Sequence, residues 1–336
     1  MWLVACGNPA PPIAADIEPP PPAAAPVLPP TSLTVAGFSA TREALQTRLL
    51  PAFAARWQRT HRSKLAIDSR FLGSEALVDG LCSDLAADVV VLASTRELDN
   101  LVAAGLVAPD WRQNRHQSIV CRSLVVLAVR PGNPKGIHNW ADLARPGVRV
   151  VGCDPTTSGC GVWAVCAIYG AAIRGHAGVP AADPAAARDF VGRVRNNVVT
   201  NGSSAHDAFL QFLAGHGDVA VTYESELGYA WMFGNDVGRV VPTSTVLVES
   251  PAIRIRRTAE DRSAAADALL AFLWSPEAQR VLANCGLRPV DPVVMGNRAT
   301  QFPSPQDLWT IEDLGGWERF TREVLPGLGS AATPGK

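Results

Sequence analysis

A membrane-spanning apolar run, a surplus of one charge and the residue spacings of metal sites are all missing from this chain. No stretch approaches the roughly 20 apolar residues that cross a bilayer. The net charge is -1 with 18% charged residues, and the densest basic cluster is the short segment from Arg254 to Arg257. Because nucleic-acid-binding proteins need a basic patch or stripe, we expect no nucleic acid among the partners.

Cysteine and histidine are not arranged as metal ligands. The sequence contains no CxxC pair and no Cys/His cluster, so we expect no metal and no cofactor. The Gly-x-x-x-x-Gly-Lys-Ser/Thr phosphate loop is absent too, which disfavours nucleotide hydrolysis. Apart from Cys6, six cysteines remain, an even number that permits up to three disulfides in an oxidising compartment. Their spacing does not select a pairing among Cys82, Cys121, Cys153, Cys160, Cys166 and Cys285.

The N-terminus carries the pattern of an exported lipoprotein. Leu3 to Gly7 reads as an apolar pair, a small residue and the cysteine, Cys6, that would be acylated. The alternative is a chance Ala-Cys pair in an apolar leader. Clusters of proline among alanines follow, which predicts an extended spacer. We therefore expect residues 1–31 to be a signal remnant and tether that holds the protein outside the cytoplasm, in the periplasm or on the outer face of the membrane.

The remaining sequence is apolar enough for a large core divided between two lobes. It is 47% hydrophobic and long enough for about two domains of ordinary size. Short apolar strands alternate with helical patterns, which predicts an α/β fold with mixed, mostly parallel sheets flanked by helices. We predict that residues 32–120 begin lobe 1, residues 121–242 form lobe 2, and residues 243–336 return to lobe 1 and add C-terminal helices. The long apolar strand from Ser118 to Arg130 is expected to connect the lobes.

The most informative segment is the turn from Asp154 to Val162, between a valine-rich strand and a long apolar helix. The first turn of a helix has unpaired N–H groups and partial positive charge. Ser158 adds a hydroxyl donor, while Gly159 and Gly161 let a ligand approach the backbone. Together these groups can hold an anion without lysine. The alternative is an ordinary N-capped helix.

Two further segments share this design of strand, small-residue turn and helix: Gly73-Ser74 and Ser203-Ser204-Ala205. In open α/β sheets such turns gather at the carboxyl ends of strands, where ligands bind. We therefore expect helix starts from two facing lobes to surround a small oxyanion in the cleft. Neither Ser158-Gly159-Cys160 nor these two turns contain Asp or Glu. A site made of donors favours a fully ionised anion such as sulfate, because a protonated phosphate would leave its O–H unpaired.

Several short motifs occur in the order and spacing of a known family. They include Phe38-Ser39-Ala40-Thr41-Arg42-Glu43, Val129 to Ile137, Pro155-Thr156-Thr157-Ser158-Gly159, Leu273 to Gln279, Leu287-Arg288-Pro289 and Gly315-Gly316-Trp317. Over about residues 34 to 325 the chain resembles the periplasmic sulfate-binding proteins, which deliver sulfate or thiosulfate to ABC importers. The resemblance implies the two-lobed type II binding-protein fold and lobe closure around a dehydrated anion. It also implies docking on ABC permease subunits, and we expect a monomer without enzymatic activity.

The resemblance assigns a set of ligand-binding residues position by position. A serine hydroxyl and the amides after it would come from the second lobe, further amides from both lobes, and a last donor from the residue that ends a strand near the cleft. The residues at these positions are Ser39, Ser74, Ser158, Gly159, Cys160, Ala205 and Tyr223. His206, just inside a helix start, is interpreted as a solvated residue that would add charge to the anion site if protonated.

Departures from the family pattern leave the anion open. The usual Ser-Gly-Gly-Ala-Arg is here Ser158-Gly159-Cys160-Gly161-Val162, an early Asp is Ser39, and the usual Trp is Tyr223, as in molybdate-binding relatives. Molybdate, tungstate or phosphate is therefore the alternative ligand. A rival interpretation is an exported thiol enzyme with Cys160 as nucleophile, because helix N-termini favour the thiolate. A third is a sensor subunit that no longer serves transport.

Overall fold

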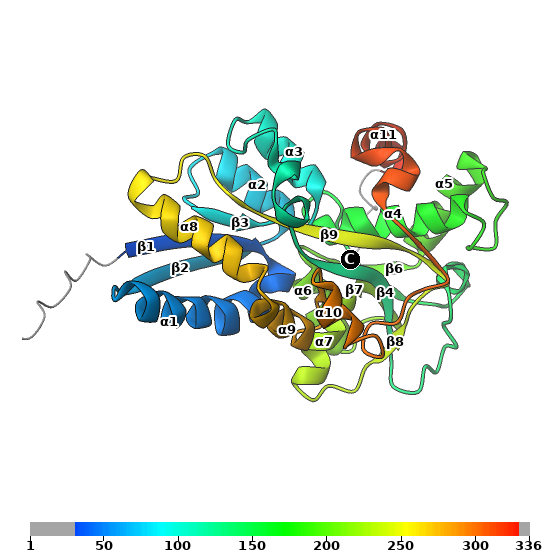
Figure 1. Cartoon of the computed structure of the whole chain (residues 1–336). Helices are drawn as coiled ribbons and strands as arrows, with labels where there is room; N and C mark the ends of the chain where they lie inside the picture. The colour runs from blue at the N-terminus through cyan, green and yellow to red at the C-terminus, as the bar shows by residue number, and fades with distance from the viewer. Residues whose placement is uncertain (1–30, 329–336) are drawn as a thin grey trace, which may run out of the picture.

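The computed structural model describes residues 31–328. The predicted lipidation site Cys6 and the predicted tether, apart from Thr31, lie outside the described residues. Two α/β lobes lie side by side and are connected by long strands (Figure 1). Within the part of the chain that is described, no helix has the length and apolar character needed to cross a membrane.

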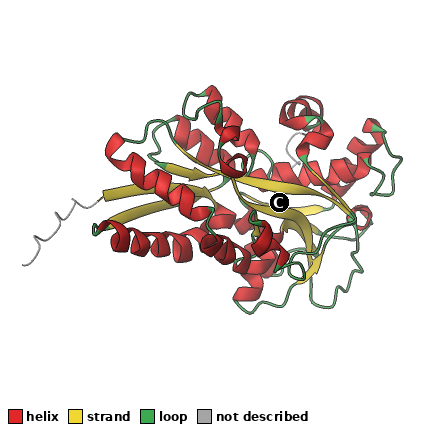
Figure 2. Ribbon diagram, viewed as in Figure 1, coloured by secondary structure: helices red, strands yellow, loops and turns green. Residues whose placement is uncertain are grey.

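The first lobe is built on three parallel strands. The central strand β1 (Thr31–Phe38) pairs with β2 (Leu65–Leu72) on one side and with β3 (Val89–Val91) on the other. The valines of β3 are buried, as expected for a strand covered on both faces. Helices cover this sheet (Figure 2); they are α1 (Leu50–His61), α2 (Ser74–Cys82), α3 (Thr95–Ala103) and α8 (Glu260–Leu273).

The helical segment that follows β1 is divided near Pro51. A 3-10 turn at Ser39–Thr41 leads into π-helical turns at Glu43–Leu49, and α1 begins at Leu50 with Pro51 in its first turn. Proline lacks an N–H and its ring clashes with the preceding turn, so it fits the start of a helix and not the interior.

The second lobe repeats the same principle. Strand β5 (Val150–Cys153) lies parallel to β6 (Val198–Gly202) and β7 (Val219–Tyr223), and β8 (Gly238–Val240) pairs antiparallel with β4 (Ile119–Val129). Its helices are α4 (Gly159–Ile173), α5 (Pro184–Asn196), α6 (Ala205–Leu213) and α7 (Glu224–Met232), beside a 3-10 turn at Trp140–Ala144. Helix α4 is buried along nearly its whole length, which agrees with a helix that is apolar on all sides.

Two long antiparallel strands connect the lobes, β4 and β9 (Ser244–Arg254). The end of β9 pairs with β3 in the first lobe, whereas the end of β4 pairs with β7 in the second. The predicted mixed α/β architecture is therefore confirmed. The predicted domain boundaries fall within β4 and just before β9, and the division itself stays a prediction.

The C-terminal segment packs against both lobes. In α11 (Gly316–Glu323), the Trp317 ring packs on Trp163 of α4 with centroids 4.5 Å apart, and its Nε1 donates to Thr95 Oγ1 at 3.0 Å. The sequence pattern does not predict this docking, because the contacts join residues far apart in the chain.

Short elements complete the fold. Those before α11 are α9 (Pro276–Asn284), β10 (Arg288–Pro289), α10 (Pro292–Gly296) and β11 (Asp307–Trp309). Turns of 3-10 helix flank α11 at Ile311–Leu314 and Leu325–Leu328, and two more precede β4 at Trp111–Gln113 and Arg115–Ser118.

Candidate anion-binding site

The three turns singled out in the sequence lie together between the lobes. A Cβ added to Gly73 would lie 3.0 Å from the Thr157 carbonyl oxygen and 3.1 Å from that of Ser203. A Cβ on Gly159 would lie 2.7 Å from Ser74 Oγ. The start of α2 in the first lobe therefore contacts the turns that precede both α4 and α6 in the second.

The backbone at these helix starts has donors to offer. Ser158 is the N-cap of α4 and is buried, yet its side chain makes no capping hydrogen bond. The Gly161 amide donates to the Ser158 carbonyl at 2.9 Å, while Gly159 and Cys160 stand earlier in the first turn, where amides have no intrahelical partner. Three converging helix N-termini also add partial positive charge, which favours an anion.

The start of α6 also has a serine at its N-cap, but this serine caps its helix. Ser204 is its N-cap, and its Oγ accepts from the Asp207 amide at 3.1 Å. Ala205 is then the first residue of the helix and is buried. Its amide stands at the position where the resemblance implies an anion donor.

Tyr223 ends β7 and is buried at 2% exposure. Its ring packs edge-on against Phe38 of the first lobe, with centroids 6.2 Å apart. Within residues 31–328 its hydroxyl has no hydrogen-bond partner. A buried hydroxyl without a partner costs about 1–3 kcal/mol, so this group is suited to a ligand that supplies the missing bond.

A cavity of about 190 Å³ lies between the lobes beside these helix starts. Ser39 and Arg42 line it from the first lobe, and His206, Ser225 and Glu226 line it from the second. Ser39 is partly buried at the start of its 3-10 turn. The structure thus places Ser39 at the cleft, in the wall of this cavity.

Comparison with known proteins identifies the family of this chain. The family described as "Bacterial extracellular solute-binding protein" matches residues 33–288. The chain belongs to this family. Its relatives bind solutes outside the cytoplasm, which is a binding role and not a catalytic one.

Several individual proteins resemble this solute-binding protein over most of its length. The sulfate-binding protein of Synechococcus elongatus is 30% identical over 305 residues, covering 88% of this chain and 84% of the relative. The thiosulfate-binding protein of Pseudomonas aeruginosa is 32% identical, covering 80% and 81%. The structure of the sulfate-binding protein SubI from Mycobacterium tuberculosis matches with a TM-score of 0.80 and 33% identity, over 88% of this chain and 99% of that one. The predicted two-lobed type II fold is therefore confirmed.

Two buried carboxyl groups border the cleft of this solute-binding protein, and neither was predicted. Glu97 accepts from the Ala93 amide at 2.8 Å, and its Oε1 would lie 3.0 Å from a Cβ on Gly159. Burial raises the pKa of Glu97 to about 7. Glu226 is 2% exposed, and its Oε1 has no partner among the described residues. The sequence contained one signal for these two residues. Each follows soon after the end of a strand, β3 or β7, and the carboxyl ends of such strands meet at the cleft.

His206 is not the solvated residue that the sequence suggested. Its side chain is 25% exposed, its Nδ1 lies 3.1 Å from Glu226 Oε2, and its ring packs edge-on against Tyr229 with centroids 4.9 Å apart. The hydrogen bond with Glu226 raises the pKa of His206 above its usual range. The correction has a physical reason: the carboxylate comes from α7, which the sequence pattern did not reveal.

The cysteines form no disulfide within the described residues, so the pairs that the even count permitted are not present. All six are free thiols, and only Cys82 is exposed among them. A hydrogen bond with the Cys153 thiol, followed by burial, raises the pKa of the Cys160 thiol well above its usual value. The helix N-terminus therefore does not produce a thiolate at Cys160.

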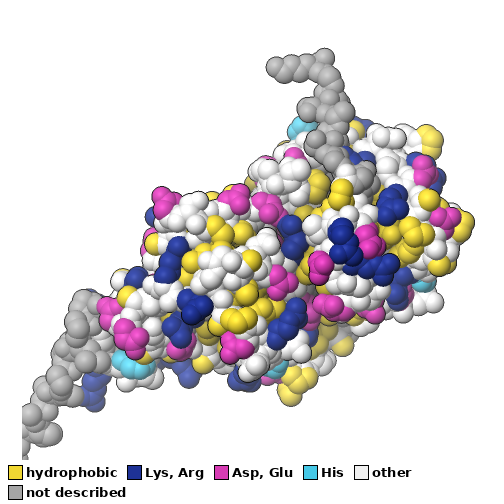
Figure 3. All heavy atoms as spheres, turned by 90° about the horizontal axis from the view of Figure 1, so that it is seen from above, with side chains coloured by type: hydrophobic (Ala, Val, Ile, Leu, Met, Phe, Trp, Pro, Cys, Tyr) yellow, Lys and Arg dark blue, Asp and Glu magenta, His cyan; other side chains and the backbone are white. Residues whose placement is uncertain are grey.

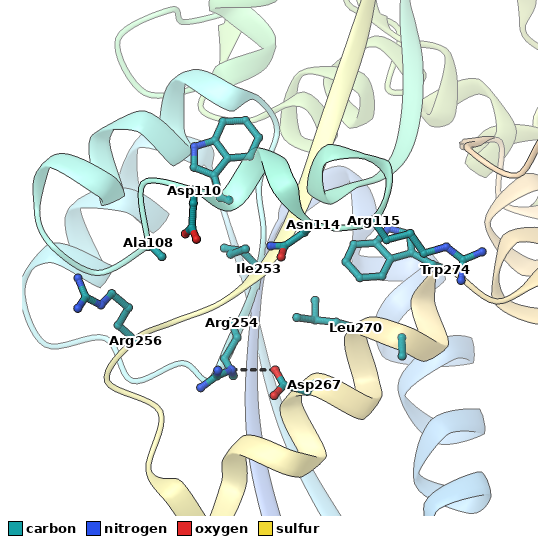
Figure 4. A pocket seen from close by; sticks show the side chains of 12 residues that line it. Ala108, Asp110, Asn114, Arg115, Ile253, Arg254, Arg256, Asp267, Leu270 and Trp274 are labelled. Atoms are coloured by element: carbon teal, nitrogen blue, oxygen red, sulfur yellow. Dashed lines mark hydrogen bonds and ion pairs between the residues drawn. The ribbon is translucent and has the colours of Figure 1, made fainter.

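A larger cavity of about 700 Å³ lies elsewhere, on the first lobe (Figure 4). Its side chains come from the segment before β4, the end of β9 and α8, and Arg254 Nε donates to Asp267 Oδ1 at 2.8 Å within it. It contains none of the predicted site residues. Basic and acidic side chains are interspersed on the face seen in Figure 3, so that face has no field of one sign.

Proposed function

We propose that the protein captures sulfate or thiosulfate outside the cytoplasm and delivers it to the permease of an ABC importer. The observation that carries this proposal is the meeting of three helix starts from two lobes at Gly73, Gly159 and Ser204. Relatives named for sulfate and thiosulfate support the choice of anion.

In this mechanism the lobes close around a dehydrated anion held by neutral donors. Ser158 gives its hydroxyl, Gly159, Cys160, Ala205 and Ser74 give amides, and Tyr223 gives its phenolic O–H, with Ser39 at the edge of the set. Because the negative charge is met by dipoles and not by a lysine, its stabilisation depends on excluding water, which strengthens each interaction. The raised pKa of Glu97 assists, since a protonated carboxyl does not repel the anion.

One observation favours a different anion. Glu226 Oε1 is a buried acceptor without a partner in the described chain, and a proton-bearing oxyanion such as hydrogen phosphate would donate to it. Calorimetric titration with sulfate, thiosulfate, molybdate, tungstate and phosphate separates the candidates. We expect sulfate or thiosulfate to bind; binding of phosphate alone, or of none of them, would contradict the proposal.

Ser158 provides the matching variant. If its buried hydroxyl donates to the anion, Ser158→Ala should weaken binding by about 1–3 kcal/mol. Ser83→Ala is the control, because Ser83 is exposed at the far end of α2 and its Oγ donates to the Asp79 carbonyl. Equal affinities for the two variants would remove Ser158 from the site.

We also propose that the protein is a monomer without catalytic activity, anchored by a lipid on Cys6. The raised pKa of Cys160 argues against a thiol enzyme. In the folded protein iodoacetamide should modify Cys82, which is exposed, and spare Cys160; rapid modification of Cys160 would favour the enzyme. Cys6→Ser should release the protein from membranes, and a variant that stays membrane-bound would argue against the lipid.

A further inference from the structure

The partly buried His206 and the buried Glu226 form a pair of titratable groups directly beside the predicted anion donors. His206 follows Ala205 in the first turn of α6, and Nδ1 lies 3.1 Å from Glu226 Oε2. Glu226 is 2% exposed and comes three residues after Tyr223. Both line the cavity of about 190 Å³ that Ser39 also lines. A change of charge on this pair therefore changes the electrostatic potential at the predicted anion donors.

The charge of the pair depends on one proton. When His206 is protonated, the imidazolium balances the Glu226 carboxylate and the pair is neutral. When His206 is deprotonated, one negative charge remains buried in the cleft, with Oε1 unpaired. A like charge close to a bound dianion is unfavourable, and more so where water is excluded.

The other groups around His206 modify this balance without replacing it. Arg42 opposes protonation of His206 and Asp207 on the same helix favours it, but the direct bond to Glu226 is the largest influence. Other titratable groups on the elements packed around it and around the cavity include Glu43, Cys153, Cys160, Tyr223, Glu224, Tyr229 and Cys285. Of these, Cys160 and Tyr223 have pKa values raised by their surroundings and stay neutral. Glu224 is itself paired with Arg239 and Arg288.

We propose that His206 and Glu226 bind one proton together with the anion, so that capture of a fully ionised oxyanion is coupled to proton uptake. This inference rests on the proposed function. Coupling between two ligands is reciprocal: the proton strengthens anion binding, and the anion raises the affinity of His206 for its proton. Anion affinity is then highest below the pKa of His206 and falls as the pH rises through it.

Sulfate is the right probe, because it is fully ionised throughout the neutral range and any pH dependence belongs to the protein. Its dissociation constant is measured by calorimetry from about pH 5.5 to about pH 8.5, on either side of the usual histidine pKa. We expect affinity to fall roughly tenfold across this range, a typical size for coupling between two sites. Titration in buffers of different ionisation enthalpy should show uptake of up to one proton per anion.

Three variants separate this pair from its neighbours. In a Glu97→Gln background, where the carboxyl group with a pKa of about 7 no longer titrates, His206→Gln should remove both the pH dependence and the proton uptake. Glu226→Gln should bind sulfate more tightly than the natural protein at the alkaline end, because the unbalanced carboxylate is gone. Glu97→Gln should keep the pH dependence, which separates the pair from the other carboxyl group with a raised pKa. His216→Gln is the control, since His216 is exposed beyond the far end of α6.

The outcomes distinguish this inference from the proposed function. If sulfate binds with an affinity independent of pH, or if His206→Gln keeps the natural profile, the coupling is wrong while anion capture stands. If neither sulfate nor thiosulfate binds at any pH, the proposed function and the coupling both fail.

Discussion

Gly159 and Ser74 face each other across the cleft so closely that a Cβ on Gly159 would lie 2.7 Å from Ser74 Oγ. Gly159 begins α4 in the second lobe, and Ser74 begins α2 in the first. The same added Cβ would also lie 3.0 Å from Glu97 Oε1. The approach of the lobes therefore depends on the missing side chain at Gly159.

Replacing this glycine should keep the lobes apart. We expect Gly159→Ala to weaken sulfate binding about fivefold or more, since overpacking of this kind typically costs about 1–3 kcal/mol. Calorimetry measures the affinity, and small-angle scattering with sulfate present should show a larger radius of gyration than for the natural protein. Gly192→Ala is the matched control. Gly192 lies within α5 with nothing within 4 Å of an added Cβ, so that variant should gain about 0.5–1 kcal/mol of stability and bind normally. Normal binding by Gly159→Ala would show that the contact does not limit closure.

Tyr223 allows a separation of ligand binding from core packing. Its buried hydroxyl has no partner in the described chain, so Tyr223→Phe should leave the free energy of unfolding without anion unchanged or higher. The same variant should bind the anion about 1–3 kcal/mol more weakly if the O–H is a donor to it. Urea unfolding and calorimetry measure the two effects. Tyr169→Phe on α4 packs against Phe320 away from the cleft and should not change the affinity. Lower stability with unchanged affinity would make Tyr223 a core residue only.

The helix starts of the site could be predicted because their chemistry is local. Small residues between a strand and a helix are visible in the sequence at Gly73, Ser158 and Ser204, and parallel strands carry such turns to one edge. Pro51 in the first turn of α1 is a local signal of the same kind. In each case a few neighbouring residues contain the whole argument.

The carboxyl groups could not be predicted in the same way. Glu97 and Glu226 lie in helices α3 and α7. Helix α3 follows the small residues Ala93 and Ser94, whereas α7 follows Tyr223 directly, so a small-residue turn does not mark both carboxyl groups. Their effect depends on the contact between Glu226 and His206 and on burial when the lobes meet, and both depend on distances between remote segments. The even number of cysteines permitted disulfides but could not predict whether they form, because a count contains no information on which thiols lie close together.

Glu97 should make the stability of the protein depend on pH. Its pKa is raised from 4.5 to about 7 by burial, so the folded state holds the proton more tightly than the unfolded chain. The contribution of Glu97 to stability is therefore greatest below pH 4.5, falls as the pH rises through the interval to about 7, and is constant above it. The loss attributable to this group is about 3 kcal/mol.

Glu97→Gln should remove this loss, because the amide oxygen can still accept from the Ala93 amide. Urea unfolding should give the variant the same stability as the natural protein near pH 4.5 and a higher stability at pH 8. His216→Gln, at an exposed position, should follow the natural profile. Equal profiles for the natural protein and Glu97→Gln would show that Glu97 titrates normally.

Arg288 in β10 holds the residue that follows Tyr223. Its Nε lies 2.6 Å from Glu224 Oε2 and its Nη2 lies 3.2 Å from Oε1, and Arg239 Nη1 reaches the same Oε1 at 2.9 Å. Both members of the Arg288–Glu224 pair are buried, with side chains 4% and 1% exposed. Removing one partner leaves a buried charge only partly compensated, so Arg288→Met should lower the free energy of unfolding by about 3–5 kcal/mol.

Arg322 provides the control for this variant. Arg322→Ala removes an exposed ion pair with Glu318 and should leave the stability unchanged, because solvent screens that pair. Urea unfolding compares the two variants. The double variant Arg288→Met with Glu224→Gln should recover part of the loss, since the unpaired carboxylate is then gone; no recovery would mean that packing of the arginine, and not its charge, stabilises this region.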